Sequence, residues 1–152
     1  MATDSIDLAI RDDLSAQADC TFNLLCSDRL YPACHPSLLA LAAEQRVTLH
    51  GEREMDWSHW TVAGGAHVGQ RDSGLNFSDP GLLLDAACNG LGIALVSQLL
   101  AQHAHDAGLL QPLTEQRVRG ANWAWLLHRD SEHNPLARPF CQWLQSALPA
   151  GA

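Results

Sequence analysis

The chain has 152 residues, 47% of them hydrophobic, which is enough for one compact domain or two small lobes with a shared core. Its formal net charge is −8, so its 17 carboxylates would repel phosphate and direct nucleic-acid binding is not expected. The nine basic residues are all arginines, which excludes enzymes that need a Schiff-base or P-loop lysine, and no run approaches the roughly 20 apolar residues of a membrane span.

The first half of the chain is predicted to contain short strands around one helix. Residues 6–10 predict a strand buried on at least one face, with Arg11, Asp12 and Asp13 at its carboxyl end. A second strand is expected over 29–34, and Pro36 then opens a helix through Leu38, Leu39, Leu41 and Ala42. Residues 47–49 predict a strand ending at His50. The glycine-rich stretch 51–76 is expected to be irregular, with room for one helical turn.

The clearest pattern lies between residues 78 and 113. Ser78, Asp79 and Pro80 predict a cap and first turn, and Gly90 ends that helix. Residues 92–96 predict a buried strand, and Ser97 caps a second helix that Gly108 stops. Helix, strand and helix with this glycine punctuation predict a parallel α/β layer. The buried stripes are expected to be Leu82, Leu83, Ala86 and Ala87 in the first helix, and Leu99, Leu100, His103, Ala104 and Ala107 in the second.

The C-terminal part predicts one strand and one helix. Residues 122–127 are aromatic and branched, which favours a strand. The final helix has Pro139 in its first turn, and its predicted apolar face consists of Phe140, Trp143, Leu144, Ala147 and Leu148.

Six pieces of the sequence occur in an order and at a spacing that carry a family resemblance. They are Ile6-Asp-Leu-Ala-Ile-Arg11, Leu30-Tyr-Pro-Ala-Cys-His-Pro36, Trp57-x-x-Trp60, Phe77-Ser-Asp79, Ala86-Ala-Cys-Asn-Gly-Leu-Gly-Ile-Ala-Leu95, and a closing pair, Trp125-Leu-Leu127 with Phe140-x-x-Trp-Leu144. Together they resemble the effector domain of LysR-type transcriptional regulators, in the branch that contains the glycine-cleavage activator and the β-lactamase regulator.

The resemblance implies an α/β fold like the type II periplasmic binding proteins, with two lobes joined by two crossover strands near 30–34 and 123–127. Lobe one would comprise residues 1–28 and 123–152, and lobe two residues 29–122. The family's winged helix-turn-helix, linker helix and first strand–helix units should precede Ile6. The resemblance therefore implies an N-terminally truncated chain with an incomplete first lobe and no DNA-binding domain.

Two segments depart from the family pattern. Asp12 and Asp13 follow Ile-Arg where the branch usually has one residue and a glycine, and His35 precedes the proline where serine is common. Both changes affect details of the expected pocket.

Five residues are candidates for effector binding. Arg11 could hold an effector carboxylate with its donor fork, or pair with Asp12 or Asp13 on the surface. Ser78 and Asp79 begin a helix, where free N–H groups favour an anion, although they could serve only as a cap. Phe77 could form an apolar cleft wall or a core contact, and His50 ends a strand that could reach the effector.

Other sites are not expected. The five cysteines form no C-x-x-C pair, and their odd number suits reduced thiols in the cytoplasm, so neither a metal nor a disulfide framework is predicted. Trp57 and Trp60 could form a stacking platform, but core packing is favoured. No G-x-S-x-G, G-x-G-x-x-G after a strand, or H-E-x-x-H motif occurs, so we expect no enzyme, no catalytic residue and no cofactor.

The predicted function is ligand sensing. A small, amino-acid-like effector would bind between the lobes of a cytoplasmic homo-oligomer, which would reach DNA only through the missing helix-turn-helix domain. Met1 to Asp7 lacks the features of a secretory signal, and no membrane partner is expected. The alternatives are a truncated remnant that acts by pairing with other chains, and an enzyme with an unrecognised site in the cleft.

Overall fold

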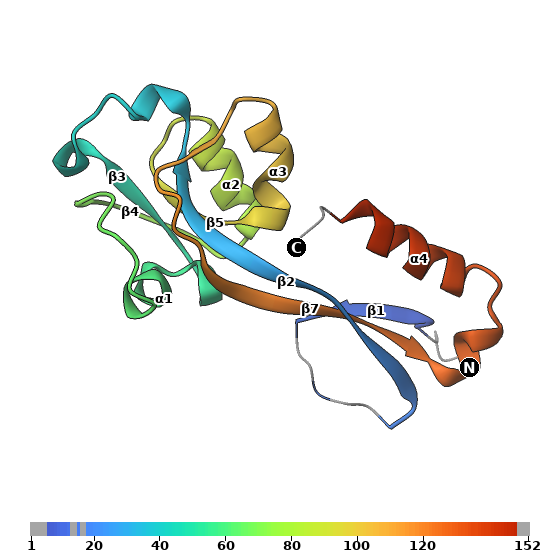
Figure 1. Cartoon of the computed structure of the whole chain (residues 1–152). Coiled ribbons are helices and arrows are strands. Elements are labelled where there is room, and N and C mark those ends of the chain that lie inside the picture. Colours follow the sequence, from blue (N-terminus) through green and yellow to red (C-terminus); the bar gives the residue numbers. More distant parts are fainter. Residues whose placement is uncertain (1–5, 13–14, 16–17, 149–152) are drawn as a thin grey trace. The chain divides into compact units, whose positions relative to one another are not determined.

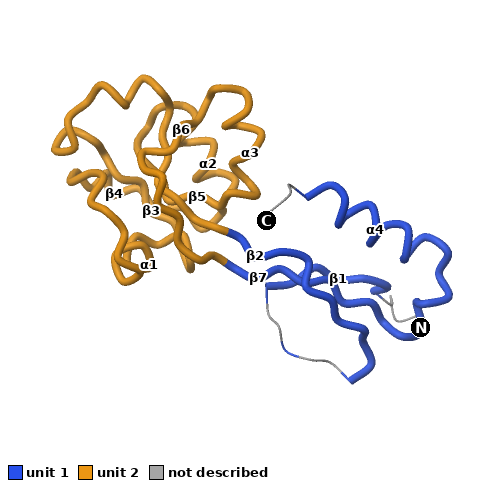
Figure 2. The backbone as a smooth tube through the Cα atoms, viewed as in Figure 1, with its two compact units in different colours: residues 1–28, 121–152 blue, residues 29–120 orange. Residues whose placement is uncertain are grey.

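The computed structural model describes residues 6–12, 15 and 18–148; Asp13 lies outside these residues. The chain forms two compact units (Figure 2), unit 1 from residues 1–28 and 121–152 and unit 2 from residues 29–120. Their assignment to the lobes of an effector domain stays a prediction.

The described part of the chain contains strands, α-helices and short 3₁₀ helices (Figure 1). The strands are β1 (Leu8–Arg11), β2 (Cys20–Cys34), β3 (Val47–Gly51), β4 (Arg71–Phe77), β5 (Ala94–Ser97), β6 (Gln111–Pro112) and β7 (Val118–His128). The α-helices are α1 (Trp57–Val62), α2 (Pro80–Cys88), α3 (Gln98–Asp106) and α4 (Ala137–Ala147). Short 3₁₀ helices are η1 (Pro36–Leu38), η2 (Ala43–Gln45), η3 (Arg53–Met55) and η4 (Arg129–His133).

Two long strands belong to both units. The five-stranded sheet has the order β1-β7-β2-β5, and β6 pairs with β2. The unit boundaries, after Asp28 and before Ala121, fall inside β2 and β7. The predicted strands over 29–34 and 122–127 are therefore present, but each is considerably longer than predicted.

Unit 2 contains the predicted parallel layer. β3 and β4 run parallel, and a parallel bridge between Thr48 and Ile93 joins β3 to the start of β5. β5 itself pairs antiparallel with β2, so the layer is mixed rather than wholly parallel. Its core includes Leu49 and Leu83, neither more than 1% exposed, which packs α2 onto β3.

Glycine ends both predicted helices of unit 2. Gly90 follows α2 with φ 77° and Gly108 follows α3 with φ 73°, a left-handed conformation that glycine adopts without a steric penalty. Ser97 caps α3 as predicted, since its Oγ accepts the N–H of Leu100 at 3.3 Å.

One predicted segment is wrong in type and another is wrong in part. The helix expected from Pro36 to Ala42 is only the 3₁₀ turn η1, in which His35 Nδ1 accepts the N–H of Ser37 at 3.2 Å. The stretch 51–76, expected to be irregular with room for one helical turn, contains the short helix α1 in keeping with that turn, but also nearly all of β4, which was not predicted.

The predicted buried stripes are partly wrong. Leu82 is 60% exposed, whereas Leu83, Ala86 and Ala87 are buried as expected. In α3 the buried residue is Ala101, while Leu100 is 49% exposed. Ala104 packs against the core as predicted, but the predicted face of α3 is wrong for Leu100 and lacks Ala101.

Unit 1 packs β1, the outer parts of β2 and β7, and α4 together. β1 pairs antiparallel with β7, from Leu8 opposite Leu127 to Arg11 opposite Ala124. β1 is half-buried rather than buried on one face, since Ile10 is 45% exposed.

The predicted apolar face of the last helix is partly wrong: Leu144 and Leu148 are half-buried, but Phe140 and Trp143 are exposed. α4 buries Ala137 and Cys141, whereas Phe140 and Trp143 are 43% and 59% exposed. Their rings contact each other with centroids 5.5 Å apart. Together with Leu136, 74% exposed, they form an apolar surface of unit 1 that we call the α4 aromatic face.

Candidate functional site

One sheet edge of unit 2 gathers four of the five predicted effector residues. β3 and β4 run parallel, with His50 opposite Asn76 and Gly51 opposite Phe77, so their carboxyl ends lie side by side. Ser78 and Asp79 follow directly and lead into α2. We call this edge, made by His50, Phe77, Ser78 and Asp79, the α2 edge.

At the α2 edge, Asp79 caps the helix. Its Oδ1 accepts the N–H of Leu82 at 2.9 Å, and its backbone carbonyl accepts the N–H of Leu83 at 3.1 Å. Pro80 occupies the first turn and has no N–H. The capping interpretation therefore holds, and an anion arriving here would meet the carboxylate of Asp79.

Phe77 combines the two roles considered for it. Its side chain is half-buried and packs against the core of unit 2. Ser78 and Asp79 next to it are exposed. The exposed part of the α2 edge therefore consists of the polar residues Ser78 and Asp79, next to the half-buried ring of Phe77.

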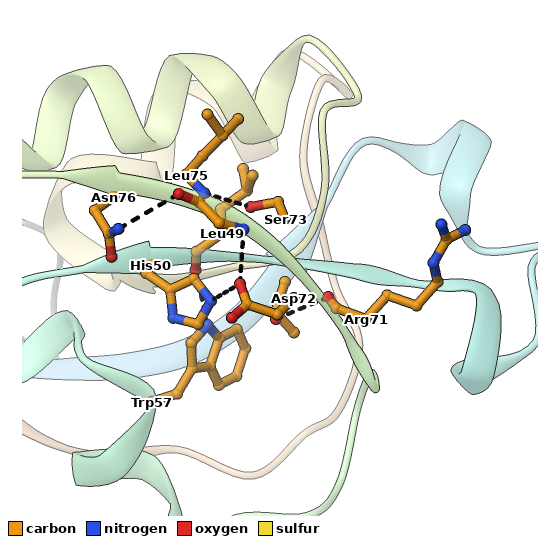
Figure 3. A network of polar contacts seen from close by, with 10 residues as sticks. Leu49, His50, Trp57, Arg71, Asp72, Ser73, Leu75 and Asn76 are labelled. Atoms are coloured by element: carbon orange, nitrogen blue, oxygen red, sulfur yellow. Dashed lines mark hydrogen bonds and ion pairs between the residues drawn. The ribbon is translucent and has the colours of Figure 1, made fainter.

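His50 points away from this core and toward a bulge in β4 (Figure 3). The register shifts between Thr48 and His50, and Gly74 in the bulge has φ 68°. Asp72 Oδ1 accepts the N–H of Gly74 at 2.7 Å and lies 2.7 Å from His50 Nε2. The bulge thus brings a carboxylate to the ring of His50.

The two carboxylates around His50 are held in the ionised form. The N–H of Gly74, and then the ring of His50, lower the pKa of Asp72. Hydrogen bonds from Ser58 lower the pKa of Asp56, with a smaller effect from the charge of His50. Since an ionised carboxylate can only accept, His50 Nε2 carries the proton that it shares with Asp72.

Beside His50 is a hollow of about 310 Å³, which we call the α1 hollow. Its lining comes from β3, α1 and the segment that precedes β4: Thr48, His50, Trp57, Trp60, Thr61, Gly65, Ala66, His67, Val68 and Gly69. Phe77, Ser78 and Asp79 do not line it, so His50 is the one predicted residue that belongs to this hollow.

The two tryptophans of α1 are fixed by hydrogen bonds. Trp57 Nε1 donates to the carbonyl of Leu49 at 2.7 Å, and Trp60 Nε1 donates to the carbonyl of Ala66 at 2.8 Å. Trp60 is 2% exposed and packs in the core, as favoured, and its ring leaves no room for a Cβ at Gly65.

Arg11 belongs to unit 1. It is the last residue of β1, opposite Ala124, and its side chain is half-buried. Its role as an effector contact stays a prediction, as do the roles of His50, Phe77, Ser78 and Asp79.

Sequence reasoning missed Asp72, Thr48 and His67. Asp72 becomes important only through the bulge, and the one signal for it was Asp-x-Gly at residues 72–74, a common turn pattern. Thr48 and His67 carry no sequence signal beyond their residue types.

All five cysteines are free thiols, and burial raises the pKa of Cys26 and Cys34. No three histidine, cysteine or acidic side chains within residues 6–12, 15 and 18–148 are placed to hold a metal ion. No helix in the same part of the chain is long and apolar enough to cross a membrane.

Sequence comparison finds one family and several regulators. The family described as LysR substrate binding domain matches residues 1–149. The HTH-type transcriptional activator AmpR of Citrobacter freundii is 28% identical over 97% of this chain and 53% of its own length. The glycine cleavage system transcriptional activator of Escherichia coli K12 is 26% identical over 97% and 51%. The chain thus spans about half the length of these curated relatives.

Solved structures show the same fold. The Citrobacter freundii effector binding domain with three substitutions matches with a TM-score of 0.71 at 21% identity, over 95% of this chain and 76% of that one. Full-length LysG of Corynebacterium glutamicum with bound effector Arg matches with a TM-score of 0.61 at 20% identity, over 92% and 50%. The predicted fold, like that of the type II periplasmic binding proteins, is confirmed.

Proposed function

The chain belongs to the LysR substrate-binding domain family, and on this basis we propose that it senses a small-molecule effector for a transcriptional regulator. The α2 edge carries the proposal. There the paired ends of β3 and β4 place Phe77, Ser78 and Asp79 together, where α/β folds commonly bind ligands. Arg11 on β1 is the proposed contact of unit 1.

An amino-acid-like effector fits the charges best. Asp79 already accepts an N–H of α2, so a second carboxylate at this edge would be repelled, while an ammonium group could bind its carboxylate oxygens. Arg11 offers the donor fork for the effector's carboxylate. LysG, a structural neighbour, is described with Arg as its bound effector.

DNA reading is assigned to another part of the regulator. The net charge of −8 disfavours phosphate binding by this domain. AmpR is described as an HTH-type activator, and both AmpR and the glycine cleavage activator are about twice as long as the match. An effector can shift the domain from one conformation to another only by as much as the effector's affinities for the two conformations differ.

Self-association is part of the proposal. The α4 aromatic face exposes Leu136, Phe140 and Trp143, and such contiguous apolar surfaces usually mark protein contacts. We assign it to contact with a second copy in a cytoplasmic oligomer. No catalytic role is assigned, in keeping with a family of transcriptional regulators.

A thermal-shift panel tests the effector proposal. Amino acids, dipeptides, dicarboxylates and aromatic acids are compared on wild type, Arg11→Ala, Ser78→Ala and the exposed control Arg138→Ala. An effector at a hundredfold excess over its Kd should stabilise wild type by roughly 2–3 kcal/mol. Arg11→Ala should reduce this stabilisation by the effector, and Arg138→Ala should not. Stabilisation by dicarboxylates alone would contradict the charge argument, and a panel without hits would contradict effector binding.

A further inference from the structure

The α1 hollow has the size of a small-ligand site and walls that are already fixed. Its volume of about 310 Å³ lies at the lower end of known ligand pockets. The indoles of Trp57 and Trp60 are each held by a backbone carbonyl. The amide of Gln116 fixes the opposite wall by accepting the N–H of Ala66 at 3.0 Å and donating to the carbonyl of Gly64 at 3.0 Å. A ligand would meet a pre-formed surface.

Most side-chain N–H and O–H groups that line the α1 hollow already donate a hydrogen bond within the protein. Besides the two indole N–H groups, Thr48 Oγ1 donates to the carbonyl of Arg71 at 3.1 Å and Thr61 Oγ1 donates to that of Trp57 at 3.0 Å. The lining therefore offers aromatic faces and acceptor oxygens rather than donors.

His50 adds a ring acceptor. Its Nε2 proton is directed to Asp72, so the neutral ring has a lone pair on Nδ1. An ammonium group can donate to this nitrogen, whereas a carboxylate cannot be bound by it.

The charges around His50 favour a cation. Asp72 on β4 and Asp56 before α1 are the carboxylates that interact with it. Among the described lining residues none is an arginine, and His67 is the other ionisable one. Arg46 adjoins Gly69 through its backbone, but its guanidinium donates to the carbonyl of Leu39 at 3.3 Å. Figure 3 shows the side chain of Arg71 extending away from His50 and Trp57.

We infer that the α1 hollow binds a small organic cation: an ammonium group on a flat apolar body. The body lies against the indole of Trp57, and the ammonium group donates to His50 Nδ1 at the end where His50 meets Asp72. This site shares His50 with the α2 edge but does not include Phe77, Ser78 or Asp79, and it does not depend on the proposed effector.

Three probes with one aromatic body and different charges test the inference: phenethylamine, 2-phenylethanol and 3-phenylpropionate. Calorimetry and tryptophan fluorescence should show the amine binding at least about tenfold more tightly than either other probe. His50→Phe, which keeps a ring but removes the acceptor, and Asp72→Asn should each weaken the amine about tenfold or more. Circular dichroism checks that both variants are folded.

Two matched controls separate this site from the others. Asp106→Asn removes another exposed carboxylate, which accepts from Gln102 at 2.8 Å, and should leave the amine's affinity unchanged. Ser78→Ala changes the α2 edge and should also leave it unchanged. Equal binding of the three probes, or undiminished amine binding by His50→Phe, overturns the inference. So does a loss caused by Ser78→Ala alone, which would place the amine at the α2 edge.

Discussion

The ring of His50 and the carboxylate of Asp72 meet across a bulge in β4, with Nε2 2.7 Å from Oδ1. The same oxygen accepts the N–H of Gly74, so one side chain fixes both the bulge and the ring. Asp72 is 70% exposed, so the arrangement is accessible to solvent and to titration.

Asp72→Asn should destabilise the protein at neutral pH and not in acid. The folded state lowers the pKa of Asp72 below its ordinary 3.8, so its stabilisation is present above that value and is lost as the pH falls through the lowered one. Urea unfolding of wild type and variant from pH 7 downward should show midpoints that converge in acid. Asp106→Asn is the control, and a midpoint difference that persists at the lowest pH would contradict this assignment.

Asp79→Ala should cost about 1 kcal/mol, because α2 loses its N-cap. Ser78→Ala, next to it and without a capping bond to α2, should stay within about 0.5 kcal/mol of wild type. Urea unfolding of both variants measures the difference. Equal losses would mean that Ser78 shares the capping role.

Gly65→Ala should cost about 2–3 kcal/mol by overpacking. A Cβ there would lie 2.1 Å from Cε2 of Trp60, which is buried and cannot move easily. Gly64→Ala is the matched control: its Cβ meets nothing within 4 Å, and only its φ of 79° makes alanine unfavourable, by about 1 kcal/mol. Tryptophan emission should change in the first variant and not in the second.

Wild type should form dimers or larger species at about 50 µM in sedimentation velocity. Replacing Phe140 and Trp143 together by serine should shift it toward monomer, because both side chains are exposed on the α4 aromatic face. Leu82→Ser, which removes an exposed leucine from unit 2, should have no such effect. A wild-type monomer would exclude this face as a contact between copies.

The sequence was sufficient where local chemistry determines the structure. Asp79, Gly90, Ser97 and Gly108 mark the ends of α2 and α3 because caps and left-handed turns depend on residue type. Family resemblance supplied the fold, which none of these local signals could define.

Contacts between segments that are distant in the chain could not be predicted from the sequence. β4 was missed because Asp72, Ser73 and Gly74 suit a turn, and only pairing with β3 makes them part of a strand. The faces of α3 and α4 were partly misplaced because apolar side chains occur around each helix, and tertiary contacts decide which are buried. The contact between Asp72 and His50 was missed for the same reason as β4, because it too depends on the pairing of β4 with β3.

The two units differ in how they are assembled from the chain, and this affects when each can fold during synthesis. Unit 2 is one continuous stretch, whereas unit 1 joins two segments that it separates. Ser27 Oγ donates to Asn122 Oδ1 at 2.7 Å, and Leu8 pairs with Leu127, so unit 1 must wait for the last part of the chain. On the ribosome, unit 2 can therefore fold while the beginning of unit 1 is still without its partners.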